Sequence, residues 1–115
     1  MQGASPVRLT ILLYDQVIQD VSRAAEAVAA TRIEQCAQEI GHAVAVIGYL
    51  QATLRHKNGH EVARNLSHFY VMLREKLMEA QVRSSIPILE DLRQQLTAVR
   101  EAWVQVEAET IPARQ

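Results

Sequence analysis

The sequence predicts an all-α protein that folds as an antiparallel, up-down-up-down four-helix bundle. Its 115 residues are rich in helix formers, and aromatic residues make up only 4% of them. Apolar residues recur at alternating spacings of three and four along successive segments, and no β pattern competes. Short connections make successive helices antiparallel. We therefore expect a single domain over residues 1–115, with helices over roughly 5–30, 31–57, 60–83 and 85–109 and a frayed tail over 110–115.

The first two helices begin at capping signals. Ser5-Pro6 starts the first helix, because serine favours the N-cap and proline the first turn. Thr31 and Glu34 have the spacing of a capping box, which predicts the start of the second helix. The core stripe expected on the first helix is Val7, Ile11, Tyr14, Ile18, Val21, Ala25 and Val28. On the second helix it is Ile33, Ala37, Ile40, Val44, Ile47 and Leu54, with Gln51 as a polar gap.

Two further breaks delimit the third and fourth helices. Asn58-Gly59 is a helix stop, since glycine suits the left-handed position after a helix end. Ser84-Ser85 before Pro87 predicts an N-cap with proline in the first turn. The core stripe expected on the third helix is Val62, Leu66, Phe69, Leu73, Leu77 and Ala80. On the fourth helix it is Leu89, Leu92, Leu96, Val99, Trp103 and Val106, and we expect Tyr14 and Trp103 to be packing residues.

Charge and cysteine usage narrow the class of partner. Twelve basic and thirteen acidic residues give a formal net charge of -1 without a block of like charge, which disfavours nucleic acid and anionic membranes as partners. Cys36 is the single cysteine, and its place in an apolar pattern predicts a small core residue. The sequence has no signal-peptide layout and no apolar run of about 18 residues. We expect a soluble, cytoplasmic protein without membrane insertion.

Seven apolar residues fall outside the core stripes when each helix is turned by about 100° per residue. These candidate partner-binding residues are Leu9, Leu12, Val46, Tyr49, Val71, Met78 and Val82. The three on the third helix share one line along it. Such a surface suits a groove that receives an amphipathic helix. Scattered surface residues or a dimer interface would leave the same pattern, so monomer and homodimer both remain open.

Motifs for catalysis or cofactor binding are missing. A di-iron bundle needs two Glu-x-x-His pairs, and Glu39 with His42 is the single pair, on the polar side of its helix. His56 and His60 are four residues apart, but a turn signal interrupts the helix between them, which argues against a zinc clamp. A phosphate-binding glycine loop and a nucleophile elbow are also absent. We expect a protein that is not an enzyme and that holds neither cofactor nor metal; a metal-binding or enzymatic bundle is the most remote alternative.

Several motifs occur in a fixed order along residues 5–104. Residues 5–15 read SPVRLTILLYD, residues 59–66 read GHEVARNL, and residues 100–103 read REAW. They resemble S/T-P-x-x-L-x-x-x-L-Y-D/N, G-G-E-I-A-x-N-L and R-E-A-W of the flagellar secretion chaperone FliS family. Phe69-Tyr70 stands where that family has L-Y, and Ala80-Gln81 where it has A-N. Val71 replaces a common Asp, which makes this part of the third helix more apolar than usual.

The resemblance implies a four-helix chaperone of the bacterial cytosol. Such a chaperone binds the disordered C-terminal segment of flagellin, prevents premature polymerisation and supports delivery to the flagellar type III export apparatus. Leu9 and Leu12 would then face a client helix. Only Met1 to Ala4 precede Ser5-Pro6, where the family usually has a longer tail, so contact with the export gate stays open. The alternative is a helical-bundle adaptor or dimerising regulator for another flagellar or secreted protein.

Overall fold

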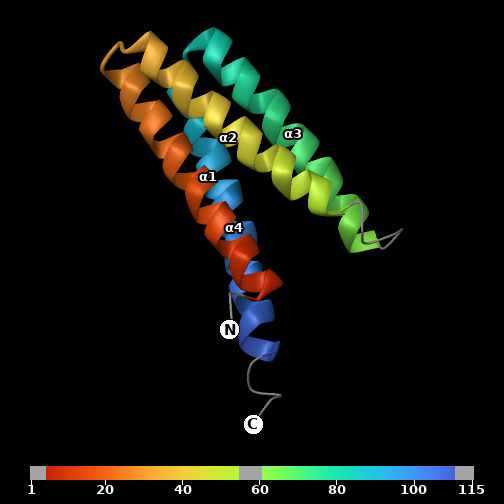
Figure 1. Cartoon of the computed structure of the whole chain (residues 1–115). Helices are drawn as coiled ribbons and strands as arrows, with labels where there is room; N and C mark the ends of the chain where they lie inside the picture. The colour runs from red at the N-terminus through yellow and green to blue at the C-terminus, as the bar shows by residue number, and fades with distance from the viewer. Residues whose placement is uncertain (1–4, 55–60, 111–115) are drawn as a thin grey trace.

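The structure is a computed structural model that describes residues 5–54 and 61–110, with the backbone alone at position 110. It contains α1 (Pro6–Ala29), α2 (Ile33–Thr53), α3 (Glu61–Arg83) and α4 (Ile86–Thr110). Successive helices run in opposite directions around a bundle, as Figure 1 shows. The predicted all-α four-helix bundle is thereby confirmed. Among the described residues, no helix is both long enough and apolar enough to cross a membrane.

The helix α1 has the most extensive interfaces in the bundle. It packs along most of its length against both α2 and α4, whereas α3 and α4 share the smallest interface. Toward the beginning of α1 the α2–α3 pair diverges from the α1–α4 pair (Figure 1). Because its interfaces with α2 and α4 are both extensive, the buried face of α1 is wider than the predicted stripe and also takes in Val17, Ala24 and Ala27.

Three residues of the predicted core stripes are exposed instead. Ile33, Val62 and Val106 each lie within about one turn of a helix end, where neighbouring helices no longer cover them. On α2 the buried line is also rotated slightly from the predicted one and follows Cys36, Ile40, Ala43, Ile47 and Leu50. Cys36 is buried as predicted.

The turn between α1 and α2 differs from the predicted capping box. Thr31 has a φ of 59°, in the left-handed region, and ends α1 instead of starting α2. The Thr31 N–H donates to the Val28 carbonyl at 3.0 Å and the Arg32 N–H to the Ala27 carbonyl at 2.7 Å, which is a Schellman motif. The N-cap of α2 is Arg32, whose side chain makes no capping hydrogen bond. The capping-box prediction is wrong because Thr31 serves the preceding helix.

The turn between α3 and α4 has the same backbone geometry but carries a true cap. Ser84 has a φ of 49°, and the Ser85 N–H donates to the Ala80 carbonyl at 3.0 Å. Ser85 Oγ then accepts from the Ile88 N–H at 3.2 Å, as the sequence predicts for an N-cap. At the start of α1, Ser5 Oγ accepts from the Arg8 N–H at 3.1 Å, which confirms that cap.

Some predictions fall outside the described residues. The helix stop at Asn58-Gly59 and the pair His56 and His60 lie in the gap over residues 55–60. Of the predicted tail over 110–115, position 110 still belongs to α4, and the remaining positions are not among those the structure describes.

Candidate functional site

The structure exposes six of the seven candidate partner-binding residues. Their exposed fractions run from 40% at Val71 to 85% at Val82; the others in this range are Leu9, Leu12, Tyr49 and Met78. Val46 is half-buried and packs against the core. The exposure of these six side chains agrees with the helical angles that the sequence predicts. Their role in binding a partner stays a prediction.

Three of these residues meet in a shallow groove between α1 and α2, which we call the outer groove. It is lined by Leu9, Leu13, His42, Ala45, Val46 and Tyr49. Leu12 lies one turn after Leu9 on α1, on the outward side of the groove. The groove is largely apolar and open along its length, which is the form that an amphipathic helix requires of its receptor.

The three candidates on α3 form a separate surface, the α3 stripe of Val71, Met78 and Val82. They are rotated around α3 away from the buried Tyr70, Leu73 and Leu77. They are not among the residues that line the outer groove, which come from α1 and α2. Lys76 and Arg83 both form ion pairs with Glu79 beside the stripe, at 3.3 and 2.8 Å. These ion pairs lower the pKa of Glu79, with the hydrogen bond from Arg83 as the largest cause.

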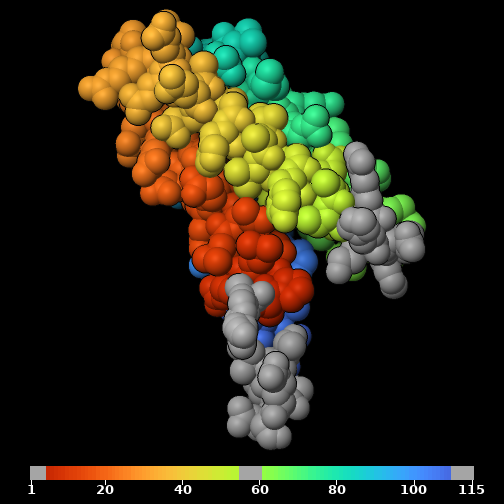
Figure 2. Space-filling model, in the orientation of Figure 1, coloured from red at the N-terminus to blue at the C-terminus, as the bar shows by residue number. Residues whose placement is uncertain are grey.

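A deeper hollow, which we call the end cleft, opens where the two helix pairs diverge. Its volume is about 320 Å³, and all four helices or their ends contribute to its wall: Pro6, Val7, Leu9, Thr10, Leu13, Tyr49, Leu50, Thr53, Leu54, Tyr70 and Trp103. Figure 2 shows the notch between the beginning of α1 and the end of α2. Leu9, Leu13 and Tyr49 border both hollows, so the outer groove and the end cleft form one continuous apolar surface.

Sequence reasoning missed the end cleft because its wall consists largely of residues with a core pattern. Val7, Leu54 and Trp103 belong to predicted core stripes, but they are only partly buried where the bundle opens. Periodicity reports which side of a helix is apolar; it does not report whether the neighbouring helix runs parallel to it or diverges.

Two buried tyrosines lie behind the end cleft. The hydroxyls of Tyr14 and Tyr70 are 2.9 Å apart and share a hydrogen bond, with ring centroids 6.3 Å apart. Burial raises the pKa of both phenols, so both remain neutral near pH 7. The indole N–H of Trp103 is buried and has no acceptor within hydrogen-bonding geometry among the residues that the structure describes. The hydrogen bond with Tyr70 lowers the pKa of Tyr14 against the larger effect of burial.

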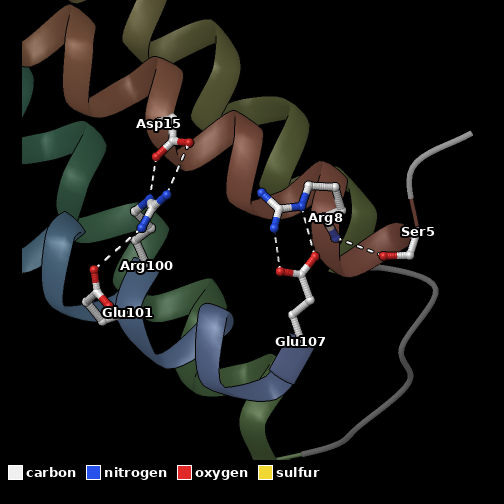
Figure 3. A network of polar contacts seen from close by, with 6 residues as sticks. All are labelled: Ser5, Arg8, Asp15, Arg100, Glu101 and Glu107. Carbon is white, nitrogen blue, oxygen red and sulfur yellow. Dashed lines mark hydrogen bonds and ion pairs between the residues drawn. The ribbon is translucent and has the colours of Figure 1, made fainter. Parts of the chain in front are cut away.

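Ion pairs hold α1 against α4 beside the end cleft (Figure 3). Arg8 binds Glu107 with two parallel contacts, Nε to Oε2 at 2.8 Å and Nη2 to Oε1 at 2.5 Å. Arg100 of α4 forms an ion pair with Asp15 of α1 and a longer one with Glu101 at 3.4 Å. The hydrogen bond to Asp15 is the largest cause that raises the pKa of Arg100. The α1 and α4 walls of the cleft are therefore joined by polar contacts as well as by packing.

A buried carboxylate that the sequence analysis did not single out joins α1 to α2. Asp20 is 1% exposed, and Gln16 Nε2 donates to its Oδ1 at 3.0 Å. His42 Nδ1 lies 2.5 Å from Asp20 Oδ2. His42 thus pairs with a carboxylate on the neighbouring helix, and Glu39 is not part of the contact. Among the residues that the structure describes, no three side chains of the metal-binding kinds gather into a group.

Comparison with known proteins identifies the family of this fold and surface. The family profile described as "Flagellar protein FliS" matches residues 1–110. The chain is 29% identical over 103 residues to the flagellar secretion chaperone FliSB of Pseudomonas aeruginosa. This alignment covers 90% of this chain and 82% of the relative. The chain is also 27% identical over 107 residues to the flagellar secretion chaperone FliS of Salmonella typhimurium. That alignment covers 92% of this chain and 79% of the relative. Because the matched region contains all four helices, the chain belongs to the FliS family of flagellar proteins.

Proposed function

We propose that the protein is a flagellar secretion chaperone of the bacterial cytosol, which binds the disordered C-terminal segment of flagellin. The segment folds into helices on the outer groove and the end cleft, and this prevents premature polymerisation. The complex is then delivered to the flagellar type III export apparatus. Support comes from the family and from the names of the two relatives, which are both flagellar secretion chaperones. The observation that carries the proposal is the continuous apolar surface shared by Leu9, Leu13 and Tyr49.

The energetics of coupled folding explain why a long apolar surface is needed. Ordering a residue costs about 1–2 kcal/mol, while burying a leucine-sized side chain contributes about 1.5–3 kcal/mol. A disordered client therefore needs several apolar contacts spread along its length. The outer groove, the end cleft and the α3 stripe present such contacts at three places on the bundle. This mode of action involves no covalent or nucleotide-dependent step, so the protein would act without catalysis.

The proposal is tested by titrating the protein with the C-terminal ~40 residues of the same organism's flagellin, by calorimetry together with circular dichroism. We expect one-to-one binding, a gain in helix content and a negative change in heat capacity, because apolar surface is buried while the segment folds. If neither heat nor helix appears, flagellin is not the client, and an adaptor for another flagellar or secreted protein becomes the better assignment.

The same titration, repeated with a variant of the outer groove, tests whether the segment binds there. Leu9→Ser with Leu12→Ser should weaken binding at least tenfold, or about 1.4 kcal/mol, because two apolar contacts are lost. The melting temperature should change little, since both side chains are about half exposed. Ile33→Ser is the matched control, an exposed apolar residue at the other end of α2. A sharp fall in the melting temperature of the double variant would instead assign Leu9 and Leu12 to the core.

A further inference from the structure

Two ion pairs join α1 to α4 beside the end cleft (Figure 3). Asp15 pairs with Arg100, and Arg8 pairs with Glu107. The two pairs are two turns apart on each helix, so both fit the same antiparallel register. Their polarity is reversed, because the carboxylate belongs to α1 in the first pair and to α4 in the second. A slip of α1 by two turns would oppose either the two arginines or the two carboxylates, and like charges repel. The pairs therefore fix the register of α1 on α4.

The pair of Arg8 and Glu107, which we call the terminal pair, is unfavourable for each helix taken alone. Arg8 lies in the first turn of α1 and Glu107 in the last turn of α4. The first turn of a helix carries partial positive charge and the last turn partial negative charge. Each side chain thus has the charge that its own helix end disfavours. The two residues stabilise the structure only by pairing across the interface between the helices.

The geometry of the terminal pair fixes orientation as well as distance. Arg8 makes two parallel contacts to the carboxylate, at 2.8 and 2.5 Å, and the Glu107 side chain is only 15% exposed. The pair lies toward the beginning of α1, where the α2–α3 pair diverges and α4 remains as the neighbour (Figure 1). Pairs near the surface contribute little to global stability. The main effect expected of this pair is therefore on the position of the first turns of α1.

Those turns form one wall of the end cleft. Leu9 and Leu13 fall between the two ion pairs on α1, Trp103 falls between them on α4, and all three line the cleft. Leu9 and Leu13 also line the outer groove. Arg8 and Glu107 are among the lining residues of neither hollow. The terminal pair can therefore act on a bound segment through the wall that it holds.

We propose that Arg8 and Glu107 are positioning residues, which hold the first two turns of α1 on α4 and so keep the α1–α4 wall of the end cleft formed before a segment binds. The identity of the segment rests on the proposed function. A preformed wall reduces what must be ordered on binding. The apparent dissociation constant rises in inverse proportion to the fraction of molecules in which the wall is formed. Breaking the pair should therefore weaken binding while the core stays intact.

Charge reversal tests the proposal in the titration with the C-terminal ~40 residues of flagellin. Arg8→Glu and Glu107→Arg should each weaken binding about fivefold, because fewer molecules have the wall in place. Arg8→Glu also completes a capping box with Ser5, so weaker binding would not come from fraying of α1 itself. The double variant restores the pair with a polarity that suits both helix ends, and it should bind within about twofold of the wild type.

A matched control separates the pair from net charge. Arg93→Glu changes the net charge by the same amount as Arg8→Glu and breaks the ion pair with Glu90 within α4, which is 2.7 Å long. Its binding should equal that of the wild type. Trp103 is the only tryptophan and reports on the wall directly. Acrylamide quenching of its fluorescence should increase in each single reversal at the terminal pair and return to the wild-type value in the double variant.

The outcomes separate this inference from the proposed function. If the wild type binds the segment but the single reversals bind it equally well, or the double variant stays weakened, the positioning role is wrong and the proposed function stands. If the wild type does not bind the segment, the proposed function is wrong and the quenching decides the role of the pair. Increased quenching in both single reversals with recovery in the double variant would support the role, and unchanged quenching would overturn it.

Discussion

Tyr14 and Tyr70 connect two helices that lie diagonally opposite in the bundle. The α1 and α3 backbones do not approach each other closely, and the two side chains cross the core to meet at their hydroxyls. Tyrosine suits this position because its ring contributes apolar packing while its hydroxyl finds a polar partner. Both side chains are at most 1% exposed, so the shared hydrogen bond forms away from bulk water. Their protonation is therefore linked to folding.

We predict that stability falls as the pH rises above the ordinary tyrosine pKa of 10.0. The folded state holds the phenol proton of Tyr70 more tightly than the unfolded state, because burial raises the folded pKa. Above the unfolded pKa the unfolded chain therefore binds fewer protons, and its stability relative to the folded chain increases with pH. The slope should approach about 1.4 kcal/mol per pH unit for this residue. Urea unfolding at a series of alkaline pH values measures it.

Two phenylalanine variants serve as the control for the alkaline effect. Tyr70→Phe removes the titrating group and should make the free energy of unfolding less dependent on pH in this range. Tyr49→Phe removes a tyrosine that is about half exposed and should leave the wild-type dependence in place. An unchanged pH dependence in Tyr70→Phe would show that this buried phenol is not the responsible group.

At the residue scale, the sequence predicts exposure better than it predicts polar contacts. The helical angle alone placed Leu9, Leu12 and Tyr49 outside the core, and all three are exposed. The burial of Asp20 could not be predicted, because it depends on Gln16 and on His42 of another helix. From the sequence alone, a carboxylate at that helical angle is expected at the surface, because its partner His42 across the α1–α2 interface is not known.

The two short turns of the bundle end one helix in the same way but start the next helix differently. Both turns are Schellman motifs, and both place a non-glycine residue in the left-handed region, Thr31 in one and Ser84 in the other. The residue that follows is also the N-cap of the next helix. Ser85 caps α4 with its side chain, whereas Arg32 cannot cap α2. The sequence predicted both helix starts within two residues. It assigned Thr31 to α2 because a β-branched residue is rare in the left-handed region, so a threonine does not mark a helix stop.

We predict that Arg32→Ser stabilises the protein. A serine at this N-cap would supply the side-chain acceptor that α2 lacks, with a gain of about 0.5–2 kcal/mol in the free energy of unfolding. Thermal unfolding followed by circular dichroism should show a rise of several degrees in the melting temperature. Arg32→Ala removes the same exposed side chain without adding a cap and should not be stabilised. If the two variants melt together, the gain does not come from capping.

At the scale of the whole molecule, the interfaces between helices are unequal. Helix α1 has the largest total interface, against α2 and α4, while α3 has the smallest total interface with its neighbours. Fold class and helix order follow from periodicity and turn signals. The divergence that opens the end cleft does not, because it depends on how side chains of different helices interdigitate and so on the crossing angles. The cleft is thus a property of the assembled bundle.

We predict that α3 opens before α1 in the native state. Sub-global opening exposes first the element with the fewest buried contacts, so amide hydrogens of α3 should exchange with solvent faster than those of α1. The comparison is made by hydrogen-exchange NMR over the middle turns, residues 14–24 of α1 and 70–80 of α3, because helix ends fray in any case. Equal protection of the two segments would mean that the bundle opens as one cooperative unit.

The helices follow each other around the bundle in the order in which they occur along the chain, and the Arg8–Glu107 pair places the beginning of α1 beside the end of α4. The four interfaces therefore form a closed cycle, whereas the chain that makes them is open. A peptide linker from α4 to α1 would close the cycle covalently, and a cut in either Schellman turn would give a circular permutant with the same core. That linker would pass beside the end cleft. Permutation would thus keep the fold while changing how a long client enters it.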